Sequence, residues 1–166
     1  MSEVSEAAVV SILIADYAAA DSVEKLNIIG GGVSVLGLTQ TGATTPFALV
    51  VIISLPPALY RSDCSVEIVL EDSSGNVVSV PGPTTEPQLM RVAQAVTFDE
   101  PPPIRGVLMP RDALRSRKQF VLNFTLGLPL AMGEQYAWRV KIDGDTRDHW
   151  AEIFVVPRPN PGPVIG

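Results

Sequence analysis

Short runs of β-branched residues, each ended by proline or glycine, constrain the fold of this chain more than any other feature. The strongest run, PFALVVIISL at 46–55, stops at Pro56–Pro57, because proline has no N–H to donate to a β-ladder. Thirteen glycines and fifteen prolines in 166 residues leave little room for long helices. The other runs with strand character lie at residues 8–17, 25–29, 32–38, 64–72, 77–80, 91–100, 119–130, 135–143 and 149–157.

Short strands at intervals of about 8–12 residues, without helices between them, are typical of antiparallel sheets packed face to face. The sequence therefore predicts an all-β fold, an antiparallel β-sandwich of the immunoglobulin-like kind, with a jelly roll or a closed barrel as the alternative. We expect residues 1–157 to form one domain and the proline-rich residues 158–166 to form an extended tail. Only residues 111–118 have helical character, and this segment is too short for an isolated helix.

The composition favours a folded, acidic protein with an apolar core. Hydrophobic residues make up 46% of the chain, and charged residues make up 18%, below the ~25% typical of soluble domains. The net charge of −6 argues against nucleic acid as a partner, because phosphate binding needs a basic surface. Residues 1–100 carry three basic and twelve acidic groups, whereas residues 101–166 carry nine and six. Such a division can mark complementary surfaces in an assembly; an unpartnered, solvated surface is the alternative.

The N-terminus and the single cysteine bear on the location of the protein. The first residues, MSEVSE, are acidic where a secretory signal would be basic, and no apolar stretch reaches the ~18 residues of a membrane span. Cys64 has no second cysteine with which to pair, which fits a reducing compartment. We therefore expect a soluble product made in the cytoplasm, with no membrane partner.

The glycine triplet in LNIIGGGVSVLG invites comparison with phosphate-binding loops. A dinucleotide fingerprint needs G-x-G-x-x-G before a helix; Gly30 and Gly32 match its first positions, but Val35 stands at the sixth. A P-loop would need a lysine followed by Ser or Thr, and the alternating residues after the triplet indicate a strand rather than a helix N-terminus. We therefore expect Gly30, Gly31 and Gly32 to be structural glycines that let the chain bend or change sheets.

No set of residues has the spacing of a catalytic or cofactor site. Asp143, Asp145 and Asp148 could hold a weakly bound Ca²⁺ ion, but the Asp-Gly pair among them is typical of a tight hairpin turn, which we expect instead. A catalytic Cys–His pair would require Cys64 to meet His149, and a lone cysteine in an apolar strand is usually buried. No serine lies in a G-x-S-x-G motif. The sequence therefore predicts no enzyme, no cofactor and no metal centre.

A basic stretch is the candidate partner-binding surface. If residues 111–118 form a helical turn or two, Arg111 and Arg115 share one face. Nucleic-acid binding would need interleaved aromatic residues, which are scarce here. We predict docking onto an acidic protein surface, with a solvated face that has no partner as the alternative. The cations of this stretch are Arg105, Arg111, Arg115, Arg117 and Lys118.

Three segments carry a resemblance to a family: IADYAAADSVEKLNIIGGG at 14–32, TPFALVVIISLP at 45–56 and GEQYAWRVKIDGD at 133–145. The chain is similar to small β-sandwich proteins of actinobacteria and their phages, which share an ADYA…KLNIIGGG opening and carry a domain of unknown function. The resemblance spans about Val9 to Val156. It implies no enzyme activity and transfers no functional residues, and it suggests a bacterial or phage source.

These features favour a non-catalytic structural protein over an enzyme. We expect an assembly component, such as a phage capsid decoration protein or another virion protein, that docks onto a capsid or other assembly subunit through its surface and its extended termini. The same features are compatible with a homo-oligomer. The alternative is a stand-alone bacterial binding module for a protein or a small ligand, located in the cytoplasm. A phage-encoded chain would be made in the cytoplasm and carried in the virion.

Overall fold

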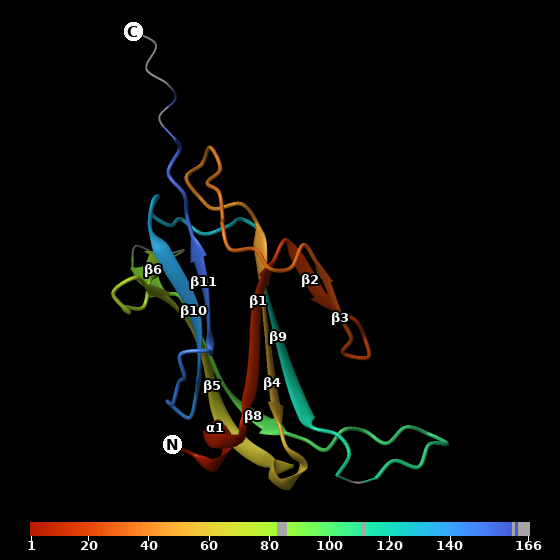
Figure 1. Cartoon of the computed structure of the whole chain (residues 1–166). Helices are drawn as coiled ribbons and strands as arrows, with labels where there is room; N and C mark the ends of the chain where they lie inside the picture. Colours follow the sequence, from red (N-terminus) through yellow and green to blue (C-terminus); the bar gives the residue numbers. More distant parts are fainter. Residues whose placement is uncertain (83–85, 111, 161, 163–166) are drawn as a thin grey trace.

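The computed structural model describes residues 1–82, 86–110, 112–160 and 162, and it is all-β, as the sequence predicts. Its strands form two main sheets and two hairpins (Figure 1). The elements are α1 Glu3–Ala7, β1 Val9–Ala15, β2 Tyr17–Ala20, β3 Leu26–Ile29, β4 Phe47–Leu55, a 3-10 turn at Pro57–Leu59, β5 Ser62–Asp72, β6 Ser79–Pro81, β7 Pro87–Leu89, β8 Arg91–Phe98, β9 Ser116–Phe124, β10 Gln135–Ile142 and β11 Ala151–Val155.

The two main sheets pack face to face and form a β-sandwich (Figure 1). One sheet has the strand order β1-β4-β9 and the other has the order β11-β10-β5-β8, and all neighbouring strands in them are antiparallel. The chain crosses from one sheet to the other between β4 and β5, between β8 and β9, and between β9 and β10. The predicted antiparallel β-sandwich is therefore confirmed, whereas its immunoglobulin-like subtype stays a prediction.

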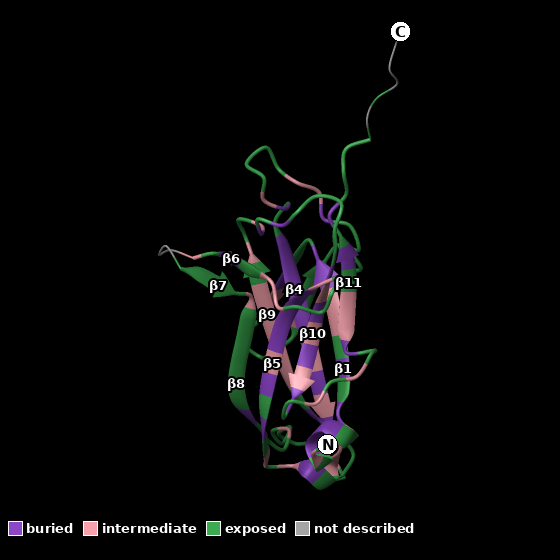
Figure 2. Cartoon of the chain, turned by 90° about the vertical axis from the view of Figure 1, so that its left-hand side faces the viewer, coloured by how far each residue is buried: buried purple, intermediate pink, exposed green. Residues whose placement is uncertain are grey.

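The hydrophobic core lies between the two sheets and is built from their inward-facing side chains. The largest buried side chains include Trp138, Trp150, Phe98 and Phe154. Figure 2 shows buried residues, in purple, along the strands of the sandwich. Both sheets and the segments that connect them contribute to one continuous apolar cluster. Removal of this surface from water is the main force that holds the two sheets together.

Strand β4 is buried on both faces along most of its length, which explains why its sequence is continuously apolar. One set of its side chains faces the core. Ala48 and Val50 face the other way and pack against Ala18 of the β2–β3 hairpin. Figure 1 shows this hairpin projecting beside the β1-β4-β9 sheet. An apolar run without alternation therefore indicates a strand that is covered on both sides.

Val66, Ile68 and Leu70 of strand β5 lie in the core. Glu71 of the same strand is also buried. Its carboxylate accepts a hydrogen bond from Arg139 Nε at 2.7 Å, and a second cation on β10, Lys141, lies at 3.7 Å. These two cations offset the loss of hydration around the carboxylate.

The N-terminus differs from the extended tail that the sequence predicts. It forms α1, which begins at a serine cap: Ser2 Oγ accepts a hydrogen bond from the N–H of Ser5 at 3.0 Å. Val4 is buried against the core, so the helix is part of the sandwich rather than a free arm. The predicted C-terminal tail falls partly on residues 161 and 163–166, which lie outside the described residues.

Three further segments depart from their predicted structure. The run predicted as one strand at 8–17 is divided at Asp16 between β1 and β2. The chain turns there and then forms the β2–β3 hairpin. Residues 32–38, expected to continue a strand, form only isolated bridges. The strand predicted at 77–80 is shifted to β6 at Ser79–Pro81, which pairs with β7 at Pro87–Leu89.

Residues 32–36, which we call the strap, link the two sheets at one edge of the sandwich. The N–H groups of Gly32 and Val33 donate to the Ile14 carbonyl of β1 at 2.9 and 3.1 Å. Two more backbone hydrogen bonds of 3.0 Å each join the strap to Val155 of β11. Gly30 and Gly32 have φ angles of 65° and 90°, which favour glycine, whereas Gly31 has no positive φ. The chain therefore turns at Gly30–Gly32 as it enters the strap.

Candidate docking surface

The segment between β8 and β9 leaves the sandwich as a long loop. We call its described residues, 99–110 and 112–115, the finger. Figure 1 shows it projecting from one end of the β1-β4-β9 sheet, on the same side as the β2–β3 hairpin. Its sequence PPPIRGVLMP at 101–110 is rich in proline, which has no N–H for a ladder, and the described residues form turns but neither strand nor helix.

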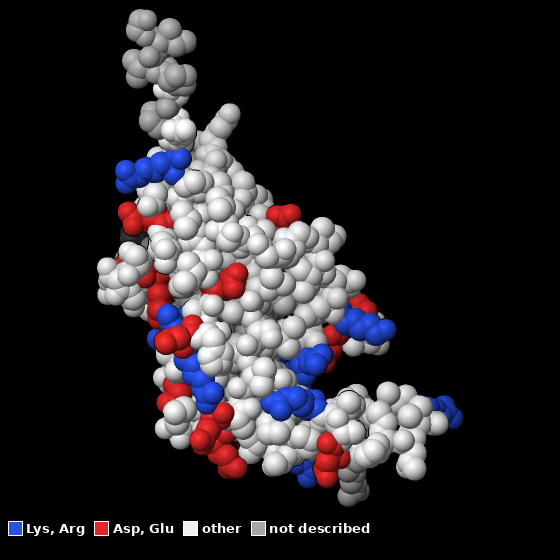
Figure 3. Space-filling model, in the orientation of Figure 1, with Lys and Arg blue, Asp and Glu red and all other residues white. Residues whose placement is uncertain are grey.

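The finger exposes a group of apolar side chains to solvent. Leu108 is 100% exposed, and Ile104 and Val107 are each 55% exposed. In Figure 3 the finger is largely uncharged, with a basic side chain at its outer end. Apolar side chains gathered on one projecting segment are typical of a surface that contacts another protein.

Polar contacts hold the base of the finger to the sandwich. Ser116 Oγ donates a hydrogen bond to the Asp99 carbonyl at 2.6 Å, which joins the two ends of the loop. Lys118 Nζ lies 3.3 Å from the Asp99 carboxylate. Near the C-terminal end of the finger, the Tyr60 hydroxyl donates a hydrogen bond to the Leu114 carbonyl. The finger is therefore positioned near both of its ends, which lowers the entropy it would lose on binding a partner.

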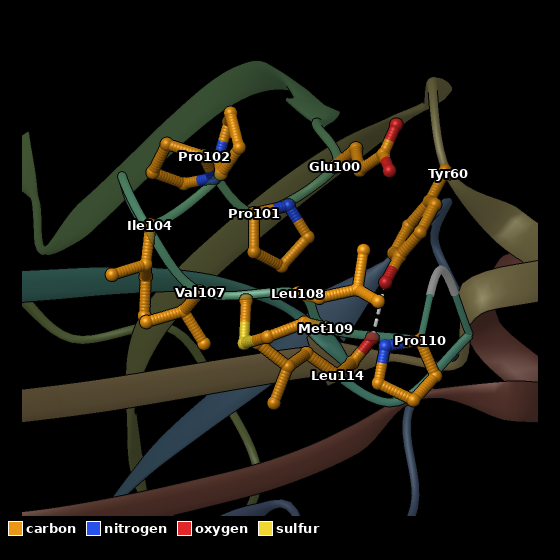
Figure 4. A pocket seen from close by; sticks show the side chains of 11 residues that line it. Tyr60, Glu100, Pro101, Pro102, Ile104, Val107, Leu108, Met109, Pro110 and Leu114 are labelled. Carbon is orange, nitrogen blue, oxygen red and sulfur yellow. Dashed lines mark hydrogen bonds between the residues drawn. The ribbon is translucent and has the colours of Figure 1, made fainter.

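The finger and Tyr60 together line a hollow of about 450 Å³ (Figure 4). Desolvation, followed by the nearby Glu100 and Asp112 carboxylates, raises the pKa of the Tyr60 phenol. The hollow could take an apolar side chain of a partner or a small apolar ligand. The lining residues are Tyr60, Glu100, Pro101, Pro102, Pro103, Ile104, Val107, Leu108, Met109, Pro110 and Leu114.

The structure separates the cations that the sequence places in one basic patch. Strand β9 begins at Ser116, so the helical turn considered for 111–118 does not form in its described residues. Alternation along β9 sends the side chains of Arg117 and Lys118 to opposite faces of the sheet. Residues 112–115 form a turn and bends before β9, and Arg111, the other cation of the predicted helical face, lies outside the described residues.

The remaining cations have different surroundings. Arg115 is an anchor: its guanidinium donates to the carbonyls of Ser54 and Ala7 at 3.1 and 3.3 Å. Arg105 is exposed next to the apolar group of the finger. Arg111 lies outside the described residues. Of the predicted binding residues that the structure describes, Arg105 is therefore the one that lies beside the exposed apolar side chains.

The aspartates considered for a Ca²⁺ site form a turn and fasten α1. Asp143 and the glycine after it have φ angles of 51° and 82°, as in a type I′ turn. Asp145 Oδ2 accepts hydrogen bonds from Ser5 Oγ at 2.6 Å and from the N–H of Ser2 at 3.0 Å, and these bonds lower the pKa of Asp145. Asp148 is exposed. Within the described ranges, no three His, Cys, Asp or Glu residues form a group that could hold a metal ion.

Cys64 is unsuited to nucleophilic chemistry at neutral pH. It is buried on β5, where Val96 of β8 is its partner in register. Burial, followed by the charges of Asp143 and Asp63, raises the pKa of the Cys64 thiol to about 11. The thiol is therefore almost entirely protonated at pH 7 and is a poor nucleophile.

Sequence reasoning selected the cations of this region and missed its apolar residues. The signal was present: Ile104, Val107 and Leu108 lie between prolines, in a stretch without the alternation of a strand. Side chains on such a segment have no sheet to carry them into the core. Apolar residues in an irregular proline-rich segment are therefore candidates for an exposed contact surface.

Comparisons with protein-family models, with curated proteins and with solved structures found no match for this chain. In the described part of the chain, no helix combines the length and the apolar character needed to cross a membrane. The geometry of the surface is therefore the basis for assigning a function.

Proposed function

We propose that the chain is a non-catalytic structural protein, an assembly component such as a phage capsid decoration protein or another virion protein, that docks onto a protein subunit through the finger. The observation that carries this proposal is the exposed group of Ile104, Val107 and Leu108 on a segment held at its base. Burial of such side chains against a partner gains about 25 cal/mol per Å² of apolar area. A phage-encoded chain would be made in the host cytoplasm and carried in the virion.

The charges near the finger favour a partner surface with an acidic rim. Arg105 is exposed beside the apolar group, and Arg117 is exposed on β9 near the base of the finger. Residues 101–166 carry nine basic and six acidic groups, whereas the rest of the chain is acidic. The complementary surface would be an apolar depression with carboxylates at its edge. The resemblance to proteins of actinobacteria and their phages supports a virion context.

The test is co-sedimentation with particles of the source phage, or with assemblies formed from the purified products of neighbouring head and tail genes. We expect the wild-type chain to sediment with one of these assemblies. We expect Leu108→Asp to stay in the supernatant, because docking would bury its carboxylate. Leu126→Asp is the matched control: Leu126 is 88% exposed on the loop at the opposite end of β9, so this variant should sediment like the wild type. A wild-type chain that sediments with none of the assemblies contradicts the proposal.

The hollow beside Tyr60 favours a second candidate function, a stand-alone cytoplasmic module that binds a small apolar ligand. Its volume of about 450 Å³ is in the range of small-molecule sites. The fluorescent probe 8-anilinonaphthalene-1-sulfonate reports such a site. Stoichiometric binding to the wild type that is lost in Leu114→Asp would support this function. Equal fluorescence for both chains would remove it.

A further inference from the structure

Strand β8 leaves one long edge of its sheet unpaired. On one side it pairs with β5, from Arg91 opposite Val69 to Phe98 opposite Ser62. On the other side, no strand in the described part of the chain pairs with it. Figure 2 shows β8 at the outer edge of the sheet, exposed over most of its length. An edge of this kind can accept a strand from another chain.

Two hydrogen bonds at the ends of β8 show which backbone groups face outward. The Met90 carbonyl accepts from the N–H of Leu70 at 3.0 Å, and the Phe98 carbonyl accepts from the N–H of Arg61 at 2.7 Å, so both point toward β5. In an antiparallel strand the N–H and C=O of one residue point to the same side, and the sides alternate along the chain. The residues whose backbone groups face away from β5 are therefore Arg91, Ala93, Ala95 and Thr97.

Strand β8 has few of the features that usually keep an exposed edge from pairing, and Arg91 at its first position is its one charged residue. Natural edge strands are often short, or carry lysine, proline or a bulge. Strand β8 is eight residues long, and its sequence RVAQAVTF contains neither lysine nor proline. Ala93 and Ala95 are small and exposed, so a neighbouring strand can approach closely. Val92 is 38% exposed and would be partly covered by such a strand.

We propose that β8 is the interface of a homodimer, in which β8 of a second copy pairs antiparallel with it across a two-fold axis at Ala95. This register places Ala95 opposite Ala95 of the other copy, and Ala93 opposite Thr97 of the other copy. All of these residues have outward-facing backbone groups, so each pair can exchange hydrogen bonds. The two four-stranded sheets then form one continuous sheet.

Charge complementarity favours a second copy as the occupant of this edge. The register that centres on Ala95 also places Arg91 of each copy opposite Asp99 of the other. The Arg91 side chain is 50% exposed beside Glu67, and the Asp99 side chain is 69% exposed beside Lys118. Both can therefore take a further partner. Opposite charges that face each other across paired strands stabilise the pairing, and the two-fold axis provides this contact twice.

The first test is size-exclusion chromatography with light scattering on a dilution series of the full chain. Ala95→Pro removes the outward N–H but leaves the pairing with β5 intact, so we expect the dimer dissociation constant to rise about tenfold or more. Ala95→Val keeps the N–H and is the matched control, which should dimerise like the wild type. A wild-type chain that is monomeric throughout, or a proline variant that dimerises equally well, overturns the proposal.

A charge-swap experiment tests the register and does not depend on the proline variant. Arg91→Asp and Asp99→Arg each place like charges opposite each other at both contacts, so each variant alone should dimerise more weakly than the wild type. In an equimolar mixture every Asp can face an Arg, and heterodimers should form. Far-UV circular dichroism checks that both variants fold. A mixture that associates no better than its components overturns the register. Ala95 lies outside the finger, so failure of the proline test is distinct from failure of the proposed docking. The charge swap also removes the contact of Asp99 with Lys118 at the base of the finger, so the proline test is the one that separates the two proposals.

Discussion

The two long edges of the sandwich are built in opposite ways. At the edge formed by β1 and β11, the strap joins the two sheets near one end through hydrogen bonds to Ile14 and Val155. Near the other end, α1 leads into β1 and is fastened to the turn after β10, where Asp145 accepts hydrogen bonds from Ser2 and Ser5. The edge formed by β8 and β9 is joined in the described residues mainly at the base of the finger, and a groove of about 310 Å³ lies between the two strands.

This difference separates stability from binding. The closed edge buries apolar side chains such as Leu36 and Val4, so its contacts contribute to the free energy of folding. The open edge leaves Val92 partly exposed and Phe120 and Leu122 only partly buried. The finger connects β8 and β9, the two strands of this edge. The surfaces that we propose for a second copy and for a partner both lie where the sandwich is least closed.

The largest expected effect comes from removing the side chain that anchors the strap. Leu36 is 2% exposed, so Leu36→Ala leaves a cavity and should lower the free energy of unfolding by about 3 kcal/mol. The matched change at the open edge is Val92→Ala, which should cost less than about 1 kcal/mol because Val92 is already half in solvent. Urea denaturation followed by tryptophan fluorescence measures both. Equal losses would show that the two edges contribute equally.

The reactivity of Cys64 tests how often the open edge separates. Its pKa of about 11 should make labelling by a thiol reagent at pH 8 about a hundredfold slower than in the urea-unfolded chain, because the thiolate fraction is lower. The raised pKa also means that burial of the neutral thiol stabilises the fold below pH ~9 and that this contribution is lost as the pH rises through 11. Labelling as fast as in the unfolded chain would show that β8 separates readily from β5.

The turn before the strap should give a smaller effect. Gly30→Ala and Gly32→Ala both place a side chain at positive φ, which costs about 1 kcal/mol. At Gly30 the added Cβ would also lie 2.0 Å from Asp16 Oδ2, so that side chain must move, whereas at Gly32 nothing lies within 4 Å. We therefore expect a loss of about 2 kcal/mol for Gly30→Ala and about 1 kcal/mol for Gly32→Ala in thermal unfolding. The reverse order would contradict the close approach to Asp16.

The smallest expected effect concerns the fastening of α1. The hydrogen bonds from Ser5 and Ser2 lower the pKa of Asp145 in the folded chain, so this contribution is present at neutral pH. This stabilising contribution should be lost as the pH falls below the pKa of Asp145 in the unfolded chain, ~3.8, and through its lower pKa in the folded chain. Asp145→Asn should shift the urea midpoint downward at pH 7 and weaken its acid dependence. Asp148→Asn, at an exposed position, is the control and should leave the midpoint and its pH dependence unchanged.

The parts of the fold that could be predicted are those in which local pattern and burial agree. Strands β4 and β5 were visible in their apolar runs, and the turn after β10 was visible in its Asp-Gly pair. Strand β9 was placed too late and was preceded by an expected helix, because RDALRSRK contains good helix formers and only pairing with β4 makes its last residues extended. Helix α1 was missed because a helix this short depends on its cap and on the contact of Val4 with the core.

The candidate site was predictable only in part, for a related reason. The cations of the finger region were evident in the sequence. The direction in which Arg117 and Lys118 point depends on whether the chain is helical or extended, and it is extended there because both residues belong to β9. The proline-rich surroundings of Leu108 marked it as a candidate contact residue, but its exposure was decided by the tertiary structure, because an apolar residue becomes a contact surface only when no other element covers it.

By itself, the sequence determined the all-β character of this protein, the apolar run that forms β4 and the glycine-rich turn that leads into the strap. These follow from alternation, β-branching and the backbone limits of glycine and proline, which act over a few residues. Only the tertiary structure decided which edge of the sandwich is closed, which backbone groups of β8 face outward and that the finger projects into solvent. These depend on pairing between segments far apart in the chain, and the periodicity of one segment carries no information about which partner lies beside it.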